Sequence, residues 1–366
     1  MSTQAVSSPP RRPLMNDSTA YIGLDVHSRT CTMAWMNENG TYQGTSTFET
    51  SGPNLRDEVS QIEADRRALT LEEGSLAFWT ARALEEVVDR TVVCDPRENS
   101  LISQSAHKND VADAKALARL LRLGEVEEVY QPENDRRALF KQAANHYTDL
   151  RDQQQKLKQK IKARLKRWGL LNIPSADVYS KSGRKAYLAE LSHGRIRTQV
   201  ESLYRLLDHT HEEKQTALEE MTQLGEPYPE IREFQKIPGM GPVGSHLFDA
   251  MIQTPHRFST KQKLFRYCKM GIESATSGDQ VKIQQLDEAG HGELKNISYQ
   301  AFCNARGAEG PNEVKTFYEA SLNRTGNEMH ARLNTQRKIL QSMWALWKNG
   351  ARYDRNRFLG PARRAG

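Results

Sequence analysis

Four acidic residues in the first third of the chain have the types and positions needed to bind divalent cations. Asp25 ends the apolar run AYIGLD and Glu72 ends RALTLE, whereas Asp110 and Asp113 lie three residues apart in KNDVADAKALARLL. A carboxylate at the end of a strand projects from the edge of its sheet, and an i,i+3 pair shares one face of a helix. Carboxylate oxygens are preferred ligands of hard cations. The four side chains are therefore predicted to converge on Mg²⁺, with Mn²⁺ as a substitute.

Each of these carboxylates also has a structural explanation when it is taken alone. An Asp after a strand commonly caps a turn, Asp110 fits a helix N-cap, and Asp113 fits the first turn of a helix. Glu73 offers a second carboxylate beside Glu72, and the sequence alone leaves both open. Alternation along the strand places Glu72 on the face of its neighbour Thr70, so Glu72 is the residue we choose. The order and spacing of all four acids favour the metal site.

The elements that would position these acids form a mixed sheet. A hydrophobic period of two predicts strands at 21–24, 30–35 and 41–48, the last two joined by a turn that ends in Asn39-Gly40. The following pattern predicts, in order, a helix at 53–67, a strand at 68–72, a helix at 79–88, a strand at 91–94 and a helix at 110–123. Three antiparallel strands followed by alternating strands and helices is the ribonuclease-H-like order, expected over 19–130. With the carboxylates, this layout is typical of metal-dependent nucleases and transposases.

Long charged helices are predicted over 131–227. Leu157, Ile161, Leu165 and Trp168 recur as one apolar stripe, which is typical of a helix that packs along one side, as in a coiled coil. Seven basic residues surround the stripe without an acidic residue among them: Lys156, Lys158, Lys160, Lys162, Arg164, Lys166 and Arg167. A solvated helix face would explain them, but a dense run of like charge is relieved by a polyanion. We interpret this helix as one that tracks a phosphate backbone.

The region 228–354 is predicted to be a mainly helical domain. It begins with IPGMGPVGSHLF, in which a Pro-Gly-x-Gly turn joins two helices as in a helix-hairpin-helix motif. Gly239 and Gly241 lack a Cβ and would let backbone N–H groups approach a phosphate, although an ordinary interhelical turn explains the same string. Further helices are expected at 311–320 and 328–349. Residues 1–18 are predicted to be a disordered tail and residues 355–366 a flexible basic tail.

Composition limits the class of protein. Lys and Arg exceed Asp and Glu by six, and the excess gathers around the basic helix. Cys31, Cys94, Cys268 and Cys303 form no CxxC pair, which argues against a structural zinc site and for a reducing compartment. No apolar stretch approaches the length of a membrane span, and the N-terminus lacks the apolar core of a signal peptide. We expect a soluble, cytoplasmic protein with no membrane partner.

The motifs GLDVHS, LEEGSLAFWTARAL, VVCDPRENSLI and KNDVADAKALARLL resemble the RuvC-like domain of the DEDD transposases of insertion-sequence family one-ten. The later stretches FSTKQKLFRYCKMGI, SATSGDQ and LDEAGHGELK resemble the C-terminal domain of that family, and RKILQSMWALWKNGARYD resembles its usual end. The resemblance spans about residues 20–354. Thr276 and His291 depart from the family pattern, which commonly has a serine and an asparagine at these places.

The resemblance implies a DNA recombinase in which Asp25, Glu72, Asp110 and Asp113 hold magnesium. Ser277 would be the nucleophile that joins the protein covalently to DNA, with Ser274 as a minor alternative. It also implies three kinds of partner: double-stranded donor and target DNA, a structured noncoding guide RNA, and further copies of the chain. The copies would form a homodimer or tetramer on nucleic acid, with composite sites between subunits.

Three other functions compete with this interpretation. A structure-selective endonuclease or junction resolvase would use the same four carboxylates with water as nucleophile, and Ser277 would be dispensable. An actin-like or sugar-kinase ATPase needs a glycine-rich turn after its first Asp, whereas Asp25 is followed by VHSRT. A non-catalytic nucleic-acid-binding descendant would have no need to retain all four acids and Ser277.

Overall fold

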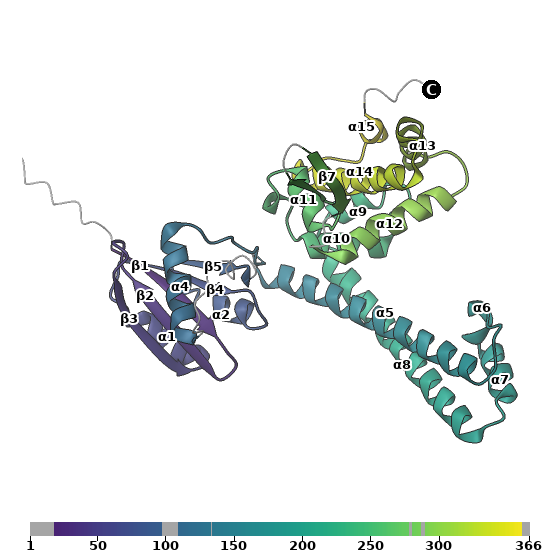
Figure 1. Cartoon of the computed structure of the whole chain (residues 1–366), viewed down its shortest axis with the longest axis horizontal. Coiled ribbons are helices and arrows are strands. Elements are labelled where there is room, and N and C mark those ends of the chain that lie inside the picture. The colour runs from purple at the N-terminus through teal and green to yellow at the C-terminus, as the bar shows by residue number, and fades with distance from the viewer. Residues whose placement is uncertain (1–17, 97–108, 133, 278–279, 287–289, 361–366) are drawn as a thin grey trace, which may run out of the picture. The chain divides into compact units, whose positions relative to one another are not determined.

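The computed structural model describes residues 18–96, 109–132, 134–277, 280–286 and 290–360 (Figure 1). They divide into two compact units between Gln131 and Pro132, and each unit is considered by itself. The second unit contains both regions predicted as 131–227 and 228–354. Of the predicted tails, residues 1–17 and 361–366 lie outside the described residues.

The first unit is built on a five-stranded sheet. Its strands are β1 (Thr19–Val26), β2 (Thr30–Met36), β3 (Tyr42–Glu49), β4 (Arg66–Glu72) and β5 (Arg90–Cys94), in the order β3-β2-β1-β4-β5. Strand β2 is antiparallel to β1 and β3, whereas β4 is parallel to β1 and β5. This mixed sheet is compatible with the predicted ribonuclease-H-like domain.

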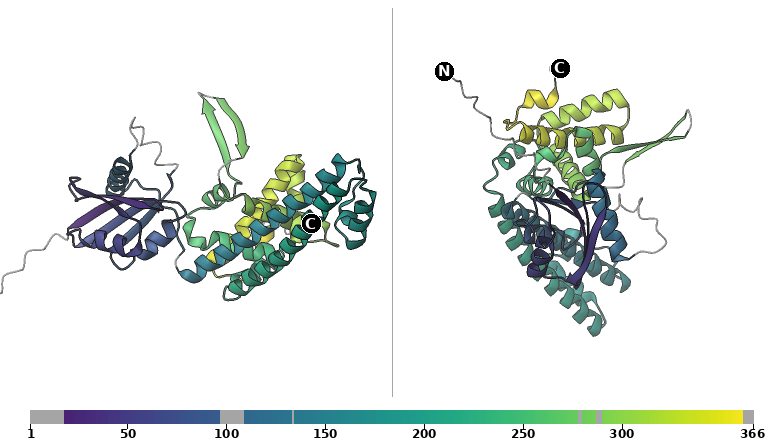
Figure 2. Two further views of the ribbon diagram at one scale, coloured as in Figure 1. Left: turned by 90° about the horizontal axis from the view of Figure 1, so that it is seen from below. Right: turned by 90° about the vertical axis from the view of Figure 1, so that its left-hand side faces the viewer.

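Helices cover both faces of this sheet. Helices α1 (Gly52–Ser60) and α2 (Ala77–Ala83) lie on one face, and α4 (Asp110–Leu123) crosses the other (Figure 2). Because side chains alternate along a strand, Ile22 and Leu24 of β1 pack with Leu55 of α1 in one core. Gly23 and Asp25 consequently belong to the face that α4 covers.

Two predicted helices of the first unit are wrong in extent. The helix predicted at 53–67 ends at Ser60, because Arg66 already pairs with Thr19 in the sheet. Just before this strand, Asp65 accepts hydrogen bonds from the backbone N–H (2.8 Å) and hydroxyl (2.9 Å) of Ser18. The helix predicted at 79–88 covers only Ala77–Ala83. The helix predicted at 110–123 is confirmed residue for residue.

The second unit contains two long helices side by side, α5 (Asp135–Arg167) and α8 (Gly194–Gly225) (Figure 1). The short helices α6 (Ser175–Val178) and α7 (Lys181–Glu190) connect them. Leu157, Ile161 and Leu165 are buried in a core that these four helices share. Trp168 follows the end of α5 and is 41% exposed, so its predicted place in the buried stripe is wrong.

The rest of the second unit surrounds a larger core. Its elements are α9 (Glu230–Phe234), α10 (Pro242–Ile252), the 3₁₀ helix η1 (Pro255–Arg257), α11 (Lys261–Tyr267), β6 (Ile272–Ser277), β7 (Gln280–Leu286), α12 (Gly292–Gly307), α13 (Glu313–Thr325), α14 (Glu328–Lys348) and α15 (Arg355–Leu359). The antiparallel pair β6–β7 was not predicted. The prediction of a wholly flexible basic tail is also wrong, because Phe358 of α15 is 2% exposed and packs against Phe317 and Tyr353.

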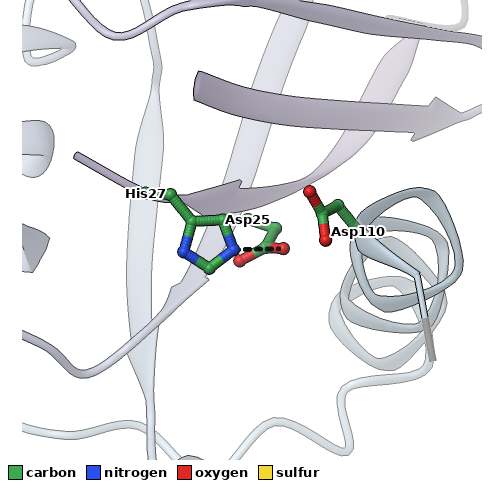
Figure 3. Close-up of side chains that lie close together, drawn as sticks. All are labelled: Asp25, His27 and Asp110. Atoms are coloured by element: carbon green, nitrogen blue, oxygen red, sulfur yellow. Dashed lines mark ion pairs between the residues drawn. The ribbon is translucent and has the colours of Figure 1, made fainter. Parts of the chain in front are cut away.

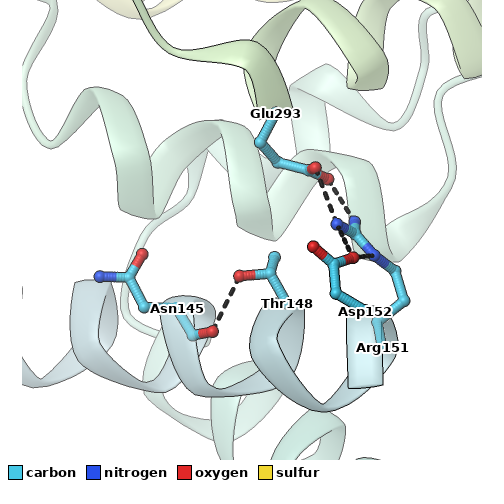
Figure 4. A network of polar contacts seen from close by, with 5 residues as sticks. All are labelled: Asn145, Thr148, Arg151, Asp152 and Glu293. Carbon is cyan, nitrogen blue, oxygen red and sulfur yellow. Dashed lines mark hydrogen bonds and ion pairs between the residues drawn. The ribbon is translucent and has the colours of Figure 1, made fainter. Parts of the chain in front are cut away.

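An ion pair joins α5 to the start of α12 (Figure 4). The guanidinium of Arg151 donates to both carboxylate oxygens of Glu293, at 2.5 and 2.9 Å, and also to Asp152 at 2.8 Å. The hydrogen bond to Glu293 raises the pKa of Arg151. One turn earlier the Thr148 hydroxyl donates to the backbone carbonyl of Asn145 at 2.8 Å. The charged pair fixes the middle of α5 against the C-terminal core.

Candidate metal centre

Asp25 and Glu72 lie at neighbouring strand ends. In the parallel pairing of β1 with β4, Leu24 is opposite Leu71, and the next residue of each strand is Asp25 and Glu72. Parallel strands end at the same edge of a sheet, so the pairing brings the two carboxylates to one place. Thr70 is buried and Glu72 is exposed, two residues apart on the same side of β4. The predicted choice of Glu72 over Glu73 stays a prediction.

The other two carboxylates come from the first turn of α4. The Asn109 side chain caps this helix by accepting a hydrogen bond from the backbone N–H of Ala112 at 2.7 Å. Asp110 and Asp113 follow within one turn, where negative charge is also stabilised by the helix dipole. The cap determines where the helix begins, and therefore where both carboxylates stand.

A close contact between α4 and β1 holds this helix start beside Asp25. A Cβ on Gly23 would lie 2.0 Å from the carbonyl oxygen of Ala114 and 2.5 Å from the backbone nitrogen of Ala118. Both alanines are fully buried. Only a glycine two residues before Asp25 lets the helix backbone approach the strand so closely.

We expect Gly23→Ala to remove divalent-cation binding and to lower the free energy of unfolding by about 1–3 kcal/mol, the usual range for an overpacked core. The added methyl group would meet backbone atoms, so α4 has to shift and carries Asp110 and Asp113 away from Asp25. Calorimetric titration with Mn²⁺ and urea denaturation measure the two effects. Gly52→Ala is the matched control, because its Cβ would come no closer than 3.5 Å to a neighbour. Unchanged Mn²⁺ affinity in Gly23→Ala would contradict this account.

The pKa of Asp25 depends on the charges of the three other predicted metal ligands. Partial burial is the main reason that the pKa of Asp25 is raised, and the charges of Asp110, Asp113 and Glu72 raise it further. His27 acts in the opposite direction and lowers it. The other three predicted metal ligands therefore lie within electrostatic reach of Asp25, an arrangement that a divalent cation would stabilise.

His27 is a candidate ligand that the sequence prediction omitted. Its Nε2 lies 3.3 Å from Oδ2 of Asp25, and ligand atoms of Asp25, His27 and Asp110 all lie within 4.8 Å of one another (Figure 3). Neighbouring ligands at about 2.1 Å from an octahedral ion stand about 3 Å apart, so the spacing of the Asp25 and His27 atoms fits one cation. The pattern Asp-x-His at a strand end was the available signal, because residues i and i+2 share a face.

Asp25, Glu72 and Glu73 open onto a cleft of ≈ 420 Å³. Asp25, His27 and Glu72 line it, together with the loop after β4 that contains Gly74 and Ser75. Glu72, Asp110 and His27 are exposed to solvent. Carboxylates suit Mg²⁺ or Mn²⁺, whereas an imidazole suits a transition-metal ion better than Mg²⁺. The open cleft leaves room for further ligands of a cation.

The remaining predicted site residues belong to the second unit. Ser277 is the last residue of β6, where its backbone pairs with Gln280. Gly239 has a positive φ of 86° in the turn between α9 and α10, and a Cβ there would lie 2.0 Å from the carbonyl oxygen of Ala301 in α12. A Cβ on Gly241 would meet nothing within 4 Å. Gly239 thus has a packing role, whereas Gly241 is the more open of the two.

The seven basic residues of α5 surround the buried stripe at exposed or half-buried positions. Lys162 donates to the Ser175 hydroxyl at 2.5 Å, and Arg164 donates to Gln199. Over the described parts of the chain, no ion pair links any of the seven to a carboxylate. The positive charge of this helix face is therefore not neutralised within the described structure.

Among all the described residues of the chain, no helix is long and apolar enough to span a bilayer.

Comparison with known families agrees with the site. A family model for IS110 DEDD enzymes, described as a transposase, matches residues 22–169, which contain the four carboxylates and the basic helix. A second model, of the transposase IS116/IS110/IS902 family, matches residues 231–319, which contain Gly239, Gly241 and Ser277. None of the curated proteins matches the chain. The sheet, the acidic cluster and the two matches define a transposase, and together the matched segments cover more than half of the sequence. The chain belongs to the IS110 family of DEDD transposases.

Proposed function

We propose that the protein cleaves and rejoins DNA strands of a mobile insertion sequence at a Mg²⁺ site formed by Asp25, Glu72, Asp110 and Asp113. The observation that carries the proposal is the convergence of the two strand ends with the first turn of α4. Burial raises the pKa of Asp25, and the charges of Asp110, Asp113 and Glu72 raise it further. The family of the chain supports a DNA substrate and a divalent cation.

The carboxylates have two tasks in this proposal. Asp25 and Asp110 present oxygens close enough to share one ion, and Glu72 and Asp113 complete the negative charge that attracts it. A bound divalent cation stabilises the charge that develops on the scissile phosphate. His27, whose Nε2 lies 3.3 Å from Oδ2 of Asp25, would as a neutral imidazole offer that nitrogen to the ion. Mn²⁺ would substitute for Mg²⁺, and the imidazole favours the exchange.

Ser277 is proposed as the nucleophile. Its Oγ attacks phosphorus and forms an ester bond, the bond from phosphorus to the leaving strand oxygen breaks, and the serine proton ends on that oxygen. The matched family segment and the place of Ser277 at the end of β6 support this assignment. Reversal of the same step with a new strand end rejoins DNA and releases the serine.

The partners in this proposal are nucleic acids and further copies of the chain. The basic face of α5 offers seven cations that have no carboxylate partner among the described residues, which suits the phosphates of double-stranded donor and target DNA or of a structured guide RNA. Gly241 at the start of α10 is a further candidate phosphate contact. A homodimer or tetramer would assemble on these nucleic acids.

A covalent-adduct assay tests the proposal. The protein is incubated with donor and target plasmids, the flanking noncoding RNA and Mg²⁺, and adducts are separated on denaturing gels. We expect Ser277→Ala to lose both the protein–DNA adduct and recombination, because the ester cannot form. Ser274→Ala, a substitution of the same size in the same strand, is expected to retain both.

Each other outcome identifies a different chemistry. Full strand cleavage by Ser277→Ala without an adduct would replace the serine mechanism with a nuclease that uses water. Loss of the adduct only in Ser274→Ala would move the nucleophile to that residue. Recombination by the wild type without added RNA would remove the guide RNA from the proposal.

A further inference from the structure

An open groove lies between α12 and α14, and none of the residues that line it has been assigned a role above. Tyr299, Cys303 and Arg306 follow one another at i, i+4 and i+7, so they share one face of α12. Met329 and Arg332 stand three residues apart on α14. Two hollows of ≈ 570 and ≈ 400 Å³ both include Tyr299, Met329 and Arg332 in their walls, which makes them parts of one groove.

Large side chains in this groove are exposed. Tyr299 is 39% exposed and Met329 is 53% exposed, although methionine is among the residues most often buried. The neighbouring Phe302 and Tyr318 are 3% and 6% exposed and form the floor. The groove therefore offers an accessible aromatic ring above a well-packed base.

The charged residues that line the groove are mostly basic. Arg306 and Arg332 line it on opposite helices, Lys295 lies farther along, and Glu328 is the one acid among the lining residues. The guanidinium of Arg306 lies 4.8 Å from the Tyr318 ring centroid and that of Arg332 lies 5.6 Å from Tyr299. The Nε of Arg332 is buried without a hydrogen-bond partner among the described residues. A guanidinium that rests on an aromatic ring uses its face for that contact, so the N–H groups at its exposed edge stay available for an anion.

We propose that this groove binds unpaired nucleotides of single-stranded DNA, with one base stacked on Tyr299 and flanking phosphates held by Arg306 and Arg332. Exposed aromatic rings within a positive groove are the common means of binding single strands, because every base has a face that can stack. Bases within a duplex are already stacked on one another, so the groove selects unpaired ends. The inference rests on the proposed function, since cutting and exchange of strands produce such ends.

A second copy of the chain is a poorer occupant. A two-fold interface brings the same surface patch of each subunit together. Arg306 and Arg332 of one groove would then approach the same two arginines of the other, with one Glu328 on each side. A polyanion complements the positive charge of this surface, whereas the same surface on a second copy of the chain would repel it.

Binding of a fluorescein-labelled 20-mer of deoxythymidine to the full chain, measured by anisotropy without metal, tests the inference. We expect Tyr299→Ala to weaken binding about 10-fold, within the range measured when one stacked base is lost. Arg332→Ala should weaken it to a similar degree, because a phosphate contact is lost. Tyr299→Phe should retain the affinity because it keeps the ring. Arg324→Ala, which removes an exposed charge at the end of α13, is the matched control. A uridine 20-mer and a duplex of the same length are expected to compete less well.

Alkylation of Cys303 gives a second readout from within the groove. Cys31, Cys94 and Cys268 are fully buried, whereas Cys303 is partly exposed. Iodoacetamide should therefore modify Cys303 first, and the deoxythymidine 20-mer should slow this reaction. Mass spectrometry of the peptide measures the rate.

The inference is overturned by unchanged affinity in both Tyr299→Ala and Arg332→Ala, or by alkylation of Cys303 at the same rate with and without the oligonucleotide. Stronger binding of the uridine 20-mer would replace DNA with RNA as the ligand, and protection that grows with protein concentration alone would replace it with a second copy. These measurements need no metal and no strand cleavage. If the protein cleaves no DNA but the oligonucleotide still slows alkylation of Cys303, the proposed function is contradicted and the groove assignment stands.

Discussion

Asp25→Asn is expected to abolish DNA strand cleavage and, in buffer free of divalent cations, to raise the melting temperature of the protein. Burial and the charges of Asp110, Asp113 and Glu72 together raise the pKa of Asp25. A carboxyl group whose pKa is raised by folding binds its proton more tightly in the folded state. Stability then falls as pH rises from the unfolded pKa of about 3.9 through the folded value, and it stays lower above that window. Near neutral pH the charged Asp25 therefore destabilises the fold, and a neutral amide removes this effect.

Thermal denaturation with and without Mg²⁺ separates these effects. Added Mg²⁺ should raise the melting temperature of the wild type, because a ligand that binds only the folded state stabilises it. The same addition should shift Asp25→Asn much less, since one ligand oxygen has been lost. Asp57→Asn, at an exposed position on α1, serves as the control for removal of one negative charge. A lower melting temperature for metal-free Asp25→Asn, or cleavage at the wild-type rate, would refute the predicted role of Asp25.

Local sequence signals were sufficient for much of the first unit. The helix at Asp110–Leu123 has an Asn109 cap, an apolar period and a Gly124 stop in the left-handed conformation, so all the information that fixes its ends is local. The strands around Asp25 follow from alternation in the same way. The helix from Gly52 ended earlier than predicted because the sheet competes for the residues after Ser60. Sheet pairing joins residues far apart in sequence, and no local pattern reports it.

The sequence was sufficient to predict the acidic residues of the candidate site. It was not sufficient to predict the contacts that hold those residues in place. Asp25 and Glu72 were found as strand-end carboxylates, but the contact of Gly23 with α4 depends on where that helix crosses the sheet. His27 could have been found from its i+2 relation to Asp25. The β6–β7 pair that ends at Ser277 was missed because SATSGDQ has few of the apolar alternations that identify strands. The groove beside Tyr299 joins two helices, so neither helix predicts it alone.

The start of α5 is attached to the core of the second unit by a buried ion pair. Arg137 donates to Asp249 of α10 and, at 3.1 Å, to Glu230 of α9. Its guanidinium also lies 3.5 Å from the ring centroid of Tyr228. Asp249 is fully buried, and its Oδ2 has no hydrogen-bond partner among the described residues. Burial raises the pKa of Asp249 well above its usual value, and Arg137 is the main influence that lowers it again.

Arg137→Ala is consequently expected to lower the free energy of unfolding by about 3–5 kcal/mol, the range for removing one partner of a buried pair. Urea denaturation near neutral pH, followed by tryptophan fluorescence, measures the change, and Trp347 beside Arg137 is a local probe. The exposed neighbour Arg136 supplies the control, since Arg136→Ala should change stability by less than about 0.5 kcal/mol.

A double variant tests whether the charge of Asp249 causes this effect. Adding Asp249→Asn to Arg137→Ala should recover part of the lost free energy of unfolding, because no unpaired charge then remains buried. The difference in free energy of unfolding between the wild type and Arg137→Ala should also shrink as pH falls. The wild type loses its ion pair when Asp249 takes up a proton. Equal losses in the single and double variants, independent of pH, would mean that Arg137 stabilises the fold by packing on Tyr228 and not by its charge.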